Sequence, residues 1–301
     1  VKINGESTKG LTSSGAVAKM RGKKGSKVEV TVIRKSWDKA KTFSLNREIV
    51  KVRSVRNSLI EPGYGYIRIA QFQNSTGTDV RKALEKLMAE QKLKGLVLDL
   101  RNNPGGILRA SVDVASLFLD GGNVVYTEGR VANADASYDA DPLDVTNDVP
   151  LVVLINQGSA SASEIVAGAL QDHGRAVIMG TRRFGKGSVQ TVLPLSDSRA
   201  IKLTTALYFT PNGRSIQAEG IVPDIVVERA TITAYNDPQQ ITEADLSGHL
   251  NNANGTSKDK KTATVASKLL ADDNQIYEAL ALLKGLNILG LRDKKVVPEV
   301  N

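Results

Sequence analysis

The central part of the chain alternates between two hydrophobic patterns. Nearly uninterrupted apolar runs of strand length occur at 95–100, 150–155 and 176–179. Such runs are typical of strands that are buried on both faces. Between them, apolar residues recur at helical spacing over 79–91 and 108–119, and a further helix is expected to start near Ser161. This alternation predicts an α/β (mixed α+β) fold with a mainly parallel or mixed sheet flanked by helices.

The two ends of the chain have different patterns. Residues 1–47 predict a short strand, a helix and an alternating strand at 28–32, and the segment is small for a core of its own. Residues 130–148 are rich in Asp, Asn and Ala and predict an exposed loop, and 251–263 predict a mobile linker. Apolar residues then recur at helical spacing from Val265 to Leu286. We therefore expect three parts, at 1–47, 48–235 and 236–301.

Composition narrows the chemistry. The 301 residues include no cysteine and two histidines, His173 and His249, which excludes thiol nucleophiles, disulfides and histidine-rich metal sites. We predict no metal and no cofactor. The net charge of +8 comes from scattered residues and aromatics are 4%, so we expect a solvated basic surface rather than a nucleic-acid site. No apolar run reaches the roughly 18–20 residues that span a bilayer, so no membrane-spanning segment is expected.

A cluster of small residues and serines at 156–165 lies between a predicted buried strand and a predicted helix. Sites in open α/β sheets form beyond the carboxyl ends of strands, and a serine there can be a nucleophile beside helix N-terminal amides. The same residues also suit an ordinary serine cap at a helix start. The segment alone leaves both interpretations open.

A lysine between glycines, Phe184-Gly185-Lys186-Gly187, is the second candidate. It could be an exposed loop cation. It does not fit the phosphate-loop pattern, which needs a glycine four residues before Gly-Lys-Ser/Thr. A lysine can also act as a general base, but only where desolvation or a nearby positive group lowers its pKa from about 10.4 towards neutrality.

These two segments and Arg101-Asn102-Asn103-Pro104-Gly105-Gly106 together resemble the C-terminal processing (tail-specific) serine proteases. Ser161 and Lys186 are 25 residues apart, as in that family, and a nucleophile at Ser159 or Ser163 would break the register. The resemblance continues through 171–176, 210–217 and 220–225 and covers about residues 1–228.

The resemblance implies a catalytic role for a small set of residues. Ser161 would attack the scissile carbonyl, Lys186 would remove its proton, and Gln190 would orient the lysine. The Ala162 amide and an amide from Gly105 or Gly106 would form the oxyanion hole. Asp172 also matches a family position, for which we expect a structural supporting role.

The resemblance also implies an organisation and a setting. Residues 22–34 resemble the second half of a PDZ domain, whose carboxylate-binding loop would precede Val1. The family implies an ATP-independent endoprotease of the bacterial periplasm, homo-oligomeric, dependent in some members on an adaptor, and able to begin at substrate C-termini. For the tail helix we favour a dimerisation or adaptor surface over packing on the protease core. Leu207 departs from the family, where many members carry a basic residue.

Three other interpretations compete with a Ser-Lys protease. His173 could be the base, although it lies near a predicted helix end where a histidine is unremarkable. The chain could be a catalytically silent PDZ-type scaffold of the cell envelope, which would not need Ser161, Lys186 and Gln190 together. A hydrolase of small esters would need a Gly-x-Ser-x-Gly turn, and residues 158–162 lack the second glycine.

Overall fold

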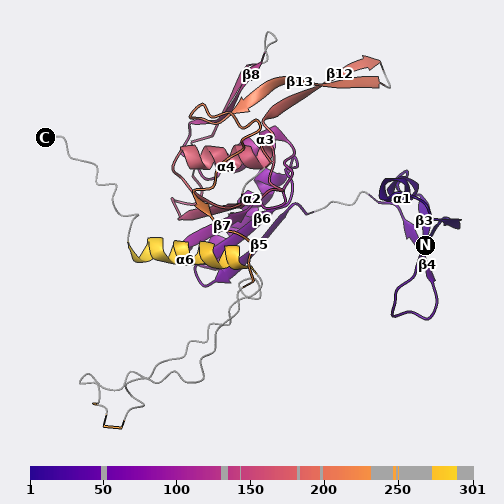
Figure 1. The fold of residues 1–301 in the computed structure, drawn as a ribbon, viewed down its shortest axis with the longest axis horizontal. Helices are drawn as coiled ribbons and strands as arrows, with labels where there is room; N and C mark the ends of the chain where they lie inside the picture. Colours follow the sequence, from indigo (N-terminus) through magenta and orange to yellow (C-terminus); the bar gives the residue numbers. More distant parts are fainter. Residues whose placement is uncertain are drawn as a thin grey trace. The chain divides into compact units, whose positions relative to one another are not determined.

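A computed structural model describes residues 1–48, 53–129, 135–142, 144–181, 184–196, 199–231, 247–248, 250 and 273–289. The chain divides into two compact units, Val1–Arg53 and Ser54–Asn301 (Figure 1). The predicted linker at 251–263 and the apolar positions 265–270 lie outside the described residues.

The first unit is a small antiparallel sheet with one helix. Its elements are β1 (Lys2–Ile3), β2 (Glu6–Ser7), α1 (Ser13–Met20), β3 (Lys27–Val32) and β4 (Lys41–Asn46), with strand order β2-β1-β3-β4. Among its described residues only Ile3 and Val28 are buried, and no residue of α1 is. The expectation that this segment is small for a core of its own agrees with this burial.

The second unit is built on a six-stranded sheet. Its strands are β5 (Val55–Glu61), β6 (Tyr64–Ile69), β7 (Gly95–Asp99), β10 (Leu151–Ile155), β11 (Val177–Gly180) and β14 (Ile225–Val226). The order is β14-β11-β10-β7-β6-β5, and every neighbouring pair is parallel except β5 with β6. The predicted α/β fold with a mixed sheet is confirmed.

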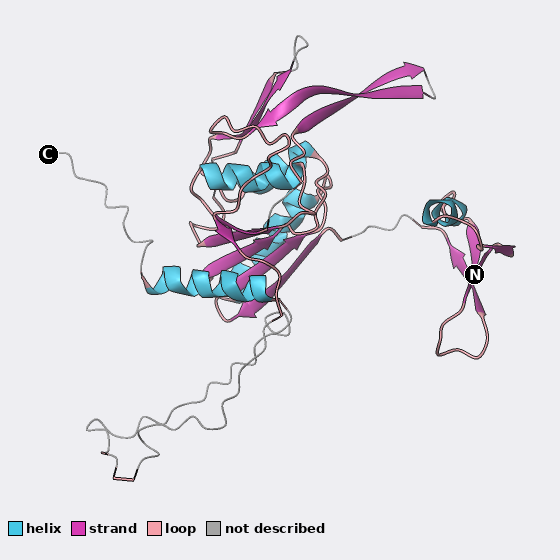
Figure 2. Cartoon of the chain, viewed as in Figure 1, coloured by secondary structure: helices cyan, strands magenta, loops and turns pink. Residues whose placement is uncertain are grey.

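Helices cover both faces of this sheet, as the uninterrupted apolar strands predict. One face packs on α2 (Thr76–Glu90), α3 (Leu108–Ser116) and α4 (Ala162–Asp172), and the other on α6 (Asn274–Ile288) (Figures 1 and 2). Side chains alternate between the faces: in β7, Leu96 and Leu98 contact the first layer and Val97 contacts the second. The β7, β10 and β11 strands therefore end, at their carboxyl ends, between two helical layers.

The apolar face of the tail helix packs on the sheet, which is the alternative that the sequence analysis ranked second. Ile276, Ala279, Leu280 and Leu283 are each at most 3% exposed. Only the outer face of α6, where Tyr277 is 50% exposed, is left for contact with a partner.

A third sheet is antiparallel and corrects one prediction. Its strands are β8 (Asn123–Gly129), β9 (Ala136–Asp139), β12 (Ser188–Ser196) and β13 (Arg199–Phe209), in the order β12-β13-β8-β9. The prediction of a loop throughout 130–148 is wrong at β9. This short strand pairs with β8, and the Asn123 amide nitrogen on β8 donates to Ser137 Oγ and to the Tyr138 carbonyl. Because the residues of β9 are mostly polar, the sequence shows no apolar pattern that would predict a strand there.

Candidate active site

Ser161 lies on a sharp turn between β10 and α4, at the carboxyl end of the parallel sheet. It is the N-cap residue of α4, but its backbone has φ 57° and ψ −115°. An ordinary serine cap has extended backbone, and a non-glycine residue in this region is strained. Ser161 does take part in a capping box with Glu164, but capping alone does not account for its strained backbone, and strain of this kind is typical of functional turns.

The loop at 101–106 follows the neighbouring strand β7 and contacts the serine turn directly. The Asn103 carbonyl accepts hydrogen bonds from the Ala160 amide (3.0 Å) and from Ser163 Oγ (2.9 Å). Gly105, with φ 97°, comes so close that a Cβ atom there would lie 2.9 Å from Ser161 Cβ. Only glycine allows this approach, so the residue type predicted for the oxyanion loop fits its place.

The backbone amides around Ser161 suit an oxyanion site. The Gly105 amide donates to Asn103 Oδ1 at 2.9 Å and is therefore engaged. Among the described residues, no acceptor is found for the amides of Gly106 and Ala162. Ala162 is also the first residue of α4, where the helix dipole favours negative charge. Of the two predicted glycines, Gly106 is the better candidate for the second donor.

The buried carboxylate of Glu164 joins the turn at 160–163, here called the serine turn, to residues 184–187, here called the lysine loop. Its Oε2 atom accepts from the Ser161 amide (2.8 Å) and from the Lys186 amide (3.0 Å), and its Oε1 atom accepts from the Gly185 amide (2.9 Å). Glu164 is 1% exposed. Because both nitrogens contact one oxygen, the backbone nitrogens of Ser161 and Lys186 are at most about 6 Å apart.

The side chains of the predicted catalytic residues are less closely joined than their backbones. Lys186 is half-buried, whereas Gln190 is exposed on β12. Within the described part of the chain, no hydrogen bond connects the side chains of Ser161, Lys186 and Gln190. Catalytic hydrogen bonds are often long without substrate and tighten in the reacting complex.

Asp172 and His173 lie at the opposite end of α4 from Ser161. Eleven residues of helix place them about 16 Å away. The Asp172 carboxylate accepts from the Asn212 amide (2.9 Å) and pairs with Arg214, so it fastens the helix end to the 210–214 turn. His173 Nε2 is bonded to the Asn123 carbonyl. His173 is therefore out of reach as a base for Ser161, and the contacts of Asp172 are those of a supporting residue.

The sequence analysis assigned no role to three residues that hold this site together. Glu164 follows Ser161 by three positions, which is the spacing of a capping box and was the available signal. Asn156 and Asn102 exchange bonds between the two loops: Asn156 Oδ1 accepts from the Asn102 amide (2.9 Å), and Asn156 Nδ2 donates to Asn102 Oδ1 (3.0 Å). No sequence pattern indicates this pairing, because the two residues are 54 positions apart.

Within the described ranges, no three metal-ligating side chains come together as they would at a metal centre. Nor does any described helix combine the length and the apolar character that crossing a membrane requires.

A strained serine at the carboxyl end of a parallel strand, beside a glycine loop and a helix N-terminus, defines a serine-hydrolase type of site. Comparison with known proteins gives the family. Residues 63–227 match the profile of peptidase family S41. The chain belongs to this family, so the resemblance drawn from the motifs is confirmed.

Similar proteins carry matching names. The chain is 44% identical to a carboxy-terminal-processing protease of Bartonella bacilliformis, over 94% of the chain and 66% of that protein. It is 42% identical to a carboxyl-terminal-processing protease of Synechocystis sp., over 81% of the chain and 58% of that protein. Among solved structures, a photosystem II D1 C-terminal processing protease is similar with a TM-score of 0.54 and 36% identity, covering 75% of this chain and 62% of that one. The chain thus spans about three fifths of the length of these relatives.

Proposed function

We propose that this chain is the protease portion of an ATP-independent serine endoprotease that cleaves protein substrates through an acyl-enzyme, with Ser161 as nucleophile and Lys186 as general base. The observation that carries the proposal is the shared Glu164 oxygen, which holds the backbones of Ser161 and Lys186 side by side. Two segments that are 25 residues apart in sequence thereby meet at one strained turn.

The proposed reaction follows from this placement. Ser161 Oγ attacks the scissile carbonyl while its proton passes to neutral Lys186 Nζ. The negative charge on the carbonyl oxygen is stabilised by the Ala162 amide and the Gly106 amide, each donor contributing about 3–4 kcal/mol. The Lys186 ammonium then protonates the leaving amine. In the second half, Lys186 takes a proton from water, the hydroxide attacks the ester, and Ser161 leaves with that proton.

Gln190 is proposed to orient Lys186 in the reacting complex. Its position on β12, four residues after the lysine, allows this only if the exposed side chain turns towards the lysine when substrate is bound. This part of the proposal depends on a rearrangement, whereas the proposed oxyanion donors, the amides of Ala162 and Gly106, have no acceptor among the described residues and need no rearrangement.

The division into domains, the way in which substrates are engaged, the location and the assembly are proposed from membership of the family. Residues 1–47 would be part of a PDZ domain, 48–235 the protease core and 236–301 a linker with a helical region. Similarity to proteins named carboxyl-terminal-processing proteases supports substrates engaged through their C-termini. We further propose a periplasmic location, homo-oligomerisation and activation by an adaptor.

The test is degradation of casein by the wild type, Ser161→Ala and Lys186→Ala, each with and without cell-envelope extract to supply an activator. Both variants should lose at least about 1000-fold in kcat, and His173→Ala, whose side chain is remote from Ser161, should stay active. Retained activity in Lys186→Ala would exclude the lysine as base. Inactivity of every form with extract present would favour the PDZ-type scaffold.

A second substrate separates endoproteolysis from the hydrolysis of small esters. The proposed function predicts cleavage of casein at internal bonds, visible as new fragments by mass spectrometry. Turnover of a small ester without any cleavage of casein would contradict it.

A further inference from the structure

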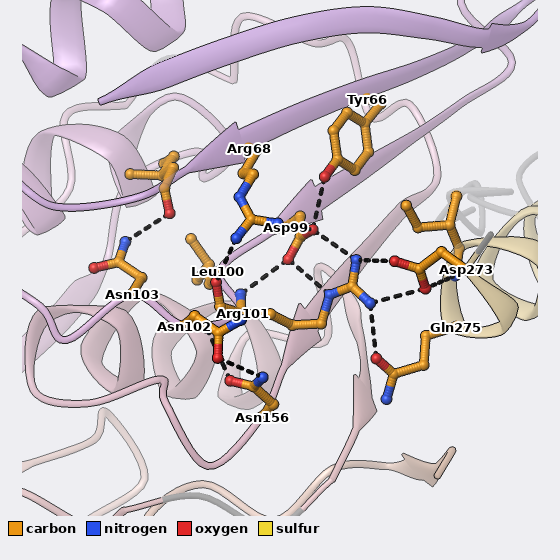
Figure 3. Close-up of polar contacts among 12 residues, drawn as sticks. Tyr66, Arg68, Asp99, Leu100, Arg101, Asn102, Asn103, Asn156, Asp273 and Gln275 are labelled. Carbon is orange, nitrogen blue, oxygen red and sulfur yellow. Dashed lines mark hydrogen bonds and ion pairs between the residues drawn. The ribbon is translucent and has the colours of Figure 1, made fainter. Parts of the chain in front are cut away.

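A buried arginine lies at the start of the oxyanion loop. The Arg101 side chain is 8% exposed, and all of its N–H groups face acceptors. Nε donates to Asp99 Oδ1 (3.0 Å) and Nη2 to Asp99 Oδ2 (2.7 Å), which is a two-pronged ion pair. Asp99 is itself fully buried and also accepts from the Tyr66 hydroxyl (2.7 Å) and from Arg68 Nη1 (3.2 Å). Arg101 thus belongs to a buried polar network, centred on Asp99, at the carboxyl end of β7 (Figure 3).

The rest of the Arg101 guanidinium is held by the tail helix. Asp273, the N-cap residue of α6, contacts Nη1 at 2.9 Å and Nη2 at 2.8 Å, and Gln275 Oε1 accepts from Nη1 at 2.7 Å. These residues are more than 170 positions from Arg101 in sequence and lie beyond the 63–227 segment that matches the family profile. In Figure 3 they approach Arg101 from the side opposite Asp99.

The backbone of Arg101 leads directly into the active site. Its amide donates to Asp99 Oδ1 (2.9 Å), and its carbonyl accepts from Arg68 Nη2 (3.3 Å). The next residues are Asn102, bonded to Asn156, and Asn103, whose carbonyl holds the Ala160 amide and Ser163 Oγ on either side of Ser161. Hydrogen bonds are thus continuous from Arg101 to the glycine loop and the serine turn.

We propose that Asp273 and Gln275 are positioning residues for the oxyanion loop, so that the docked tail helix α6 sets the efficiency of the Ser161 site. This inference rests on the proposed protease function. The physical reason is that a buried guanidinium must keep acceptors around it. When the acceptors from α6 are removed, Arg101 has to turn towards water or to new partners. An error of about 1 Å at reacting groups can cost on the order of 100-fold in rate.

The central variant is Asp273→Ser in the full chain. Serine is as good an N-cap as aspartate, so the start of α6 is preserved while the contact with Arg101 is lost. Asp273→Asn keeps the length and one acceptor and should restore part of the activity. Lys284→Ala is the matched control, because Lys284 on the same helix pairs with Glu61 and not with the oxyanion loop. A second variant, Gln275→Ala, tests the other acceptor.

The expected results separate positioning from a general loss of stability. For Asp273→Ser, kcat should fall about 10-fold or more with KM within about twofold, Asp273→Asn should lie between it and the wild type, and Lys284→Ala should match the wild type. A peptide aldehyde, which forms a tetrahedral adduct, should bind more weakly by the factor lost in kcat/KM. A variant that merely unfolds more easily would have normal kcat per molecule titrated by the aldehyde, and this outcome would overturn the inference.

Hydrogen exchange gives a measurement that does not need turnover. In the inactive Ser161→Ala background, peptides covering 101–107 should exchange faster with Asp273→Ser than with Lys284→Ala. If exchange and kcat are both unchanged while Ser161→Ala and Lys186→Ala are inactive, the inference fails and the proposed function stands. If Ser161→Ala stays active, the proposed function fails, and the exchange result still decides whether α6 positions the loop.

Discussion

The two loops that meet at Ser161 are built differently. The proposed oxyanion loop at 101–106, called the oxyanion loop below, is closely bonded: Asn103 is fully buried, Arg101 nearly so, and both contact neighbouring segments through side chain and backbone. The lysine loop is held mainly by its backbone, through Glu164 and Gln217, while Phe184 is 69% exposed and Gln190 is exposed. The groups that would stabilise charge are thus held by buried side-chain contacts, whereas the half-buried side chain of the proposed base, Lys186, makes no hydrogen bond to Ser161 or Gln190 among the described residues.

This difference indicates which of the two loops could change position with the smaller loss of contacts. Preorganised donors contribute most when they need no rearrangement, and the oxyanion loop satisfies this condition. A proton-transfer group can be moved in and out of reach at the cost of a few exposed contacts. We therefore expect substitutions in the loop at 101–106 to lower kcat severely and by similar factors for different substrates. Substitutions around Lys186, other than of Lys186 itself, should lower kcat by smaller and more varied factors.

Apart from Ser161→Ala and Lys186→Ala, the largest effect is expected from Gly105→Ala. A Cβ atom at this position would lie 2.6 Å from the Ala160 carbonyl and 2.9 Å from Ser161 Cβ, so the loop must move away from the serine. We expect kcat to fall by about 100- to 1000-fold, measured with casein or a peptide. Gly121→Ala is the control, since Gly121 has a similar φ of 85° but a nearest neighbour at 3.7 Å. Equal losses in the two variants would show that backbone strain alone is responsible.

Glu164→Gln should have the next largest effect. The amide keeps the shape of the carboxylate but turns one acceptor into a donor, which then faces backbone N–H groups. We expect kcat to fall about 10- to 100-fold, and thermal or urea unfolding to show a loss of about 1–3 kcal/mol. Glu85→Gln, at an exposed position of α2, controls for the change in charge. Wild-type kcat in Glu164→Gln would mean that the lysine loop does not depend on this carboxylate.

A smaller effect is expected from Gln190→Ala. If the side chain orients Lys186 only with substrate bound, kcat should fall up to about 10-fold, while stability stays within about 0.5 kcal/mol because the residue is exposed. Thr204→Ala changes the residue opposite Gln190 on β13 and is the control. An unchanged kcat in Gln190→Ala would remove Gln190 from the mechanism.

The last expected effect is on stability rather than on rate, and it concerns acid and the network behind the oxyanion loop. Burial by itself raises the pKa of Asp99, but the hydrogen bonds and charge of Arg101, together with the Tyr66 hydroxyl, outweigh it and lower that pKa below its ordinary value. The stability that this carboxylate contributes is therefore complete above its unfolded pKa of about 3.9 and is lost as pH falls below that value.

Tyr66→Phe tests this assignment. It should cost about 1.5–3 kcal/mol at pH 6, because a hydrogen bond to a charged group is removed. The difference from the wild type should shrink as Asp99 becomes protonated, which urea unfolding at pH 6 and pH 3 would measure. Tyr277→Phe, on the exposed face of α6, should show no difference at either pH. A Tyr66→Phe cost that does not change with pH would contradict the assignment.

The sequence predicts the strands and helices of this molecule better than the contacts between segments that are distant in sequence. The runs at 95–100 and 150–155 identify doubly covered strands because burial on both faces removes polar residues from them. The spacing of Ser161 and Lys186 predicts the site by resemblance, and this stays a prediction. The strained backbone of Ser161 and the pairing of Arg101 with Asp273 could not be predicted. The first is a property of one turn in space, and the second joins residues brought together only by the complete fold. The amphipathic pattern of α6 likewise shows that one face is covered but not by what.

The position of α6 has a consequence for the order of events during synthesis. The helices that cover one face of the sheet have all been synthesised once the chain reaches residue 173. The helix that covers the other face, α6, starts only at Asn274. A ribosome adding about 5–20 residues per second needs several seconds for the stretch between β14 and α6. During that interval Val97, Val152 and Leu154 lack the apolar partner that α6 supplies, and Arg101 lacks Asp273. The contact between Asp273 and Arg101, which we propose to position the oxyanion loop, therefore forms only after every other part of the proposed site has been synthesised.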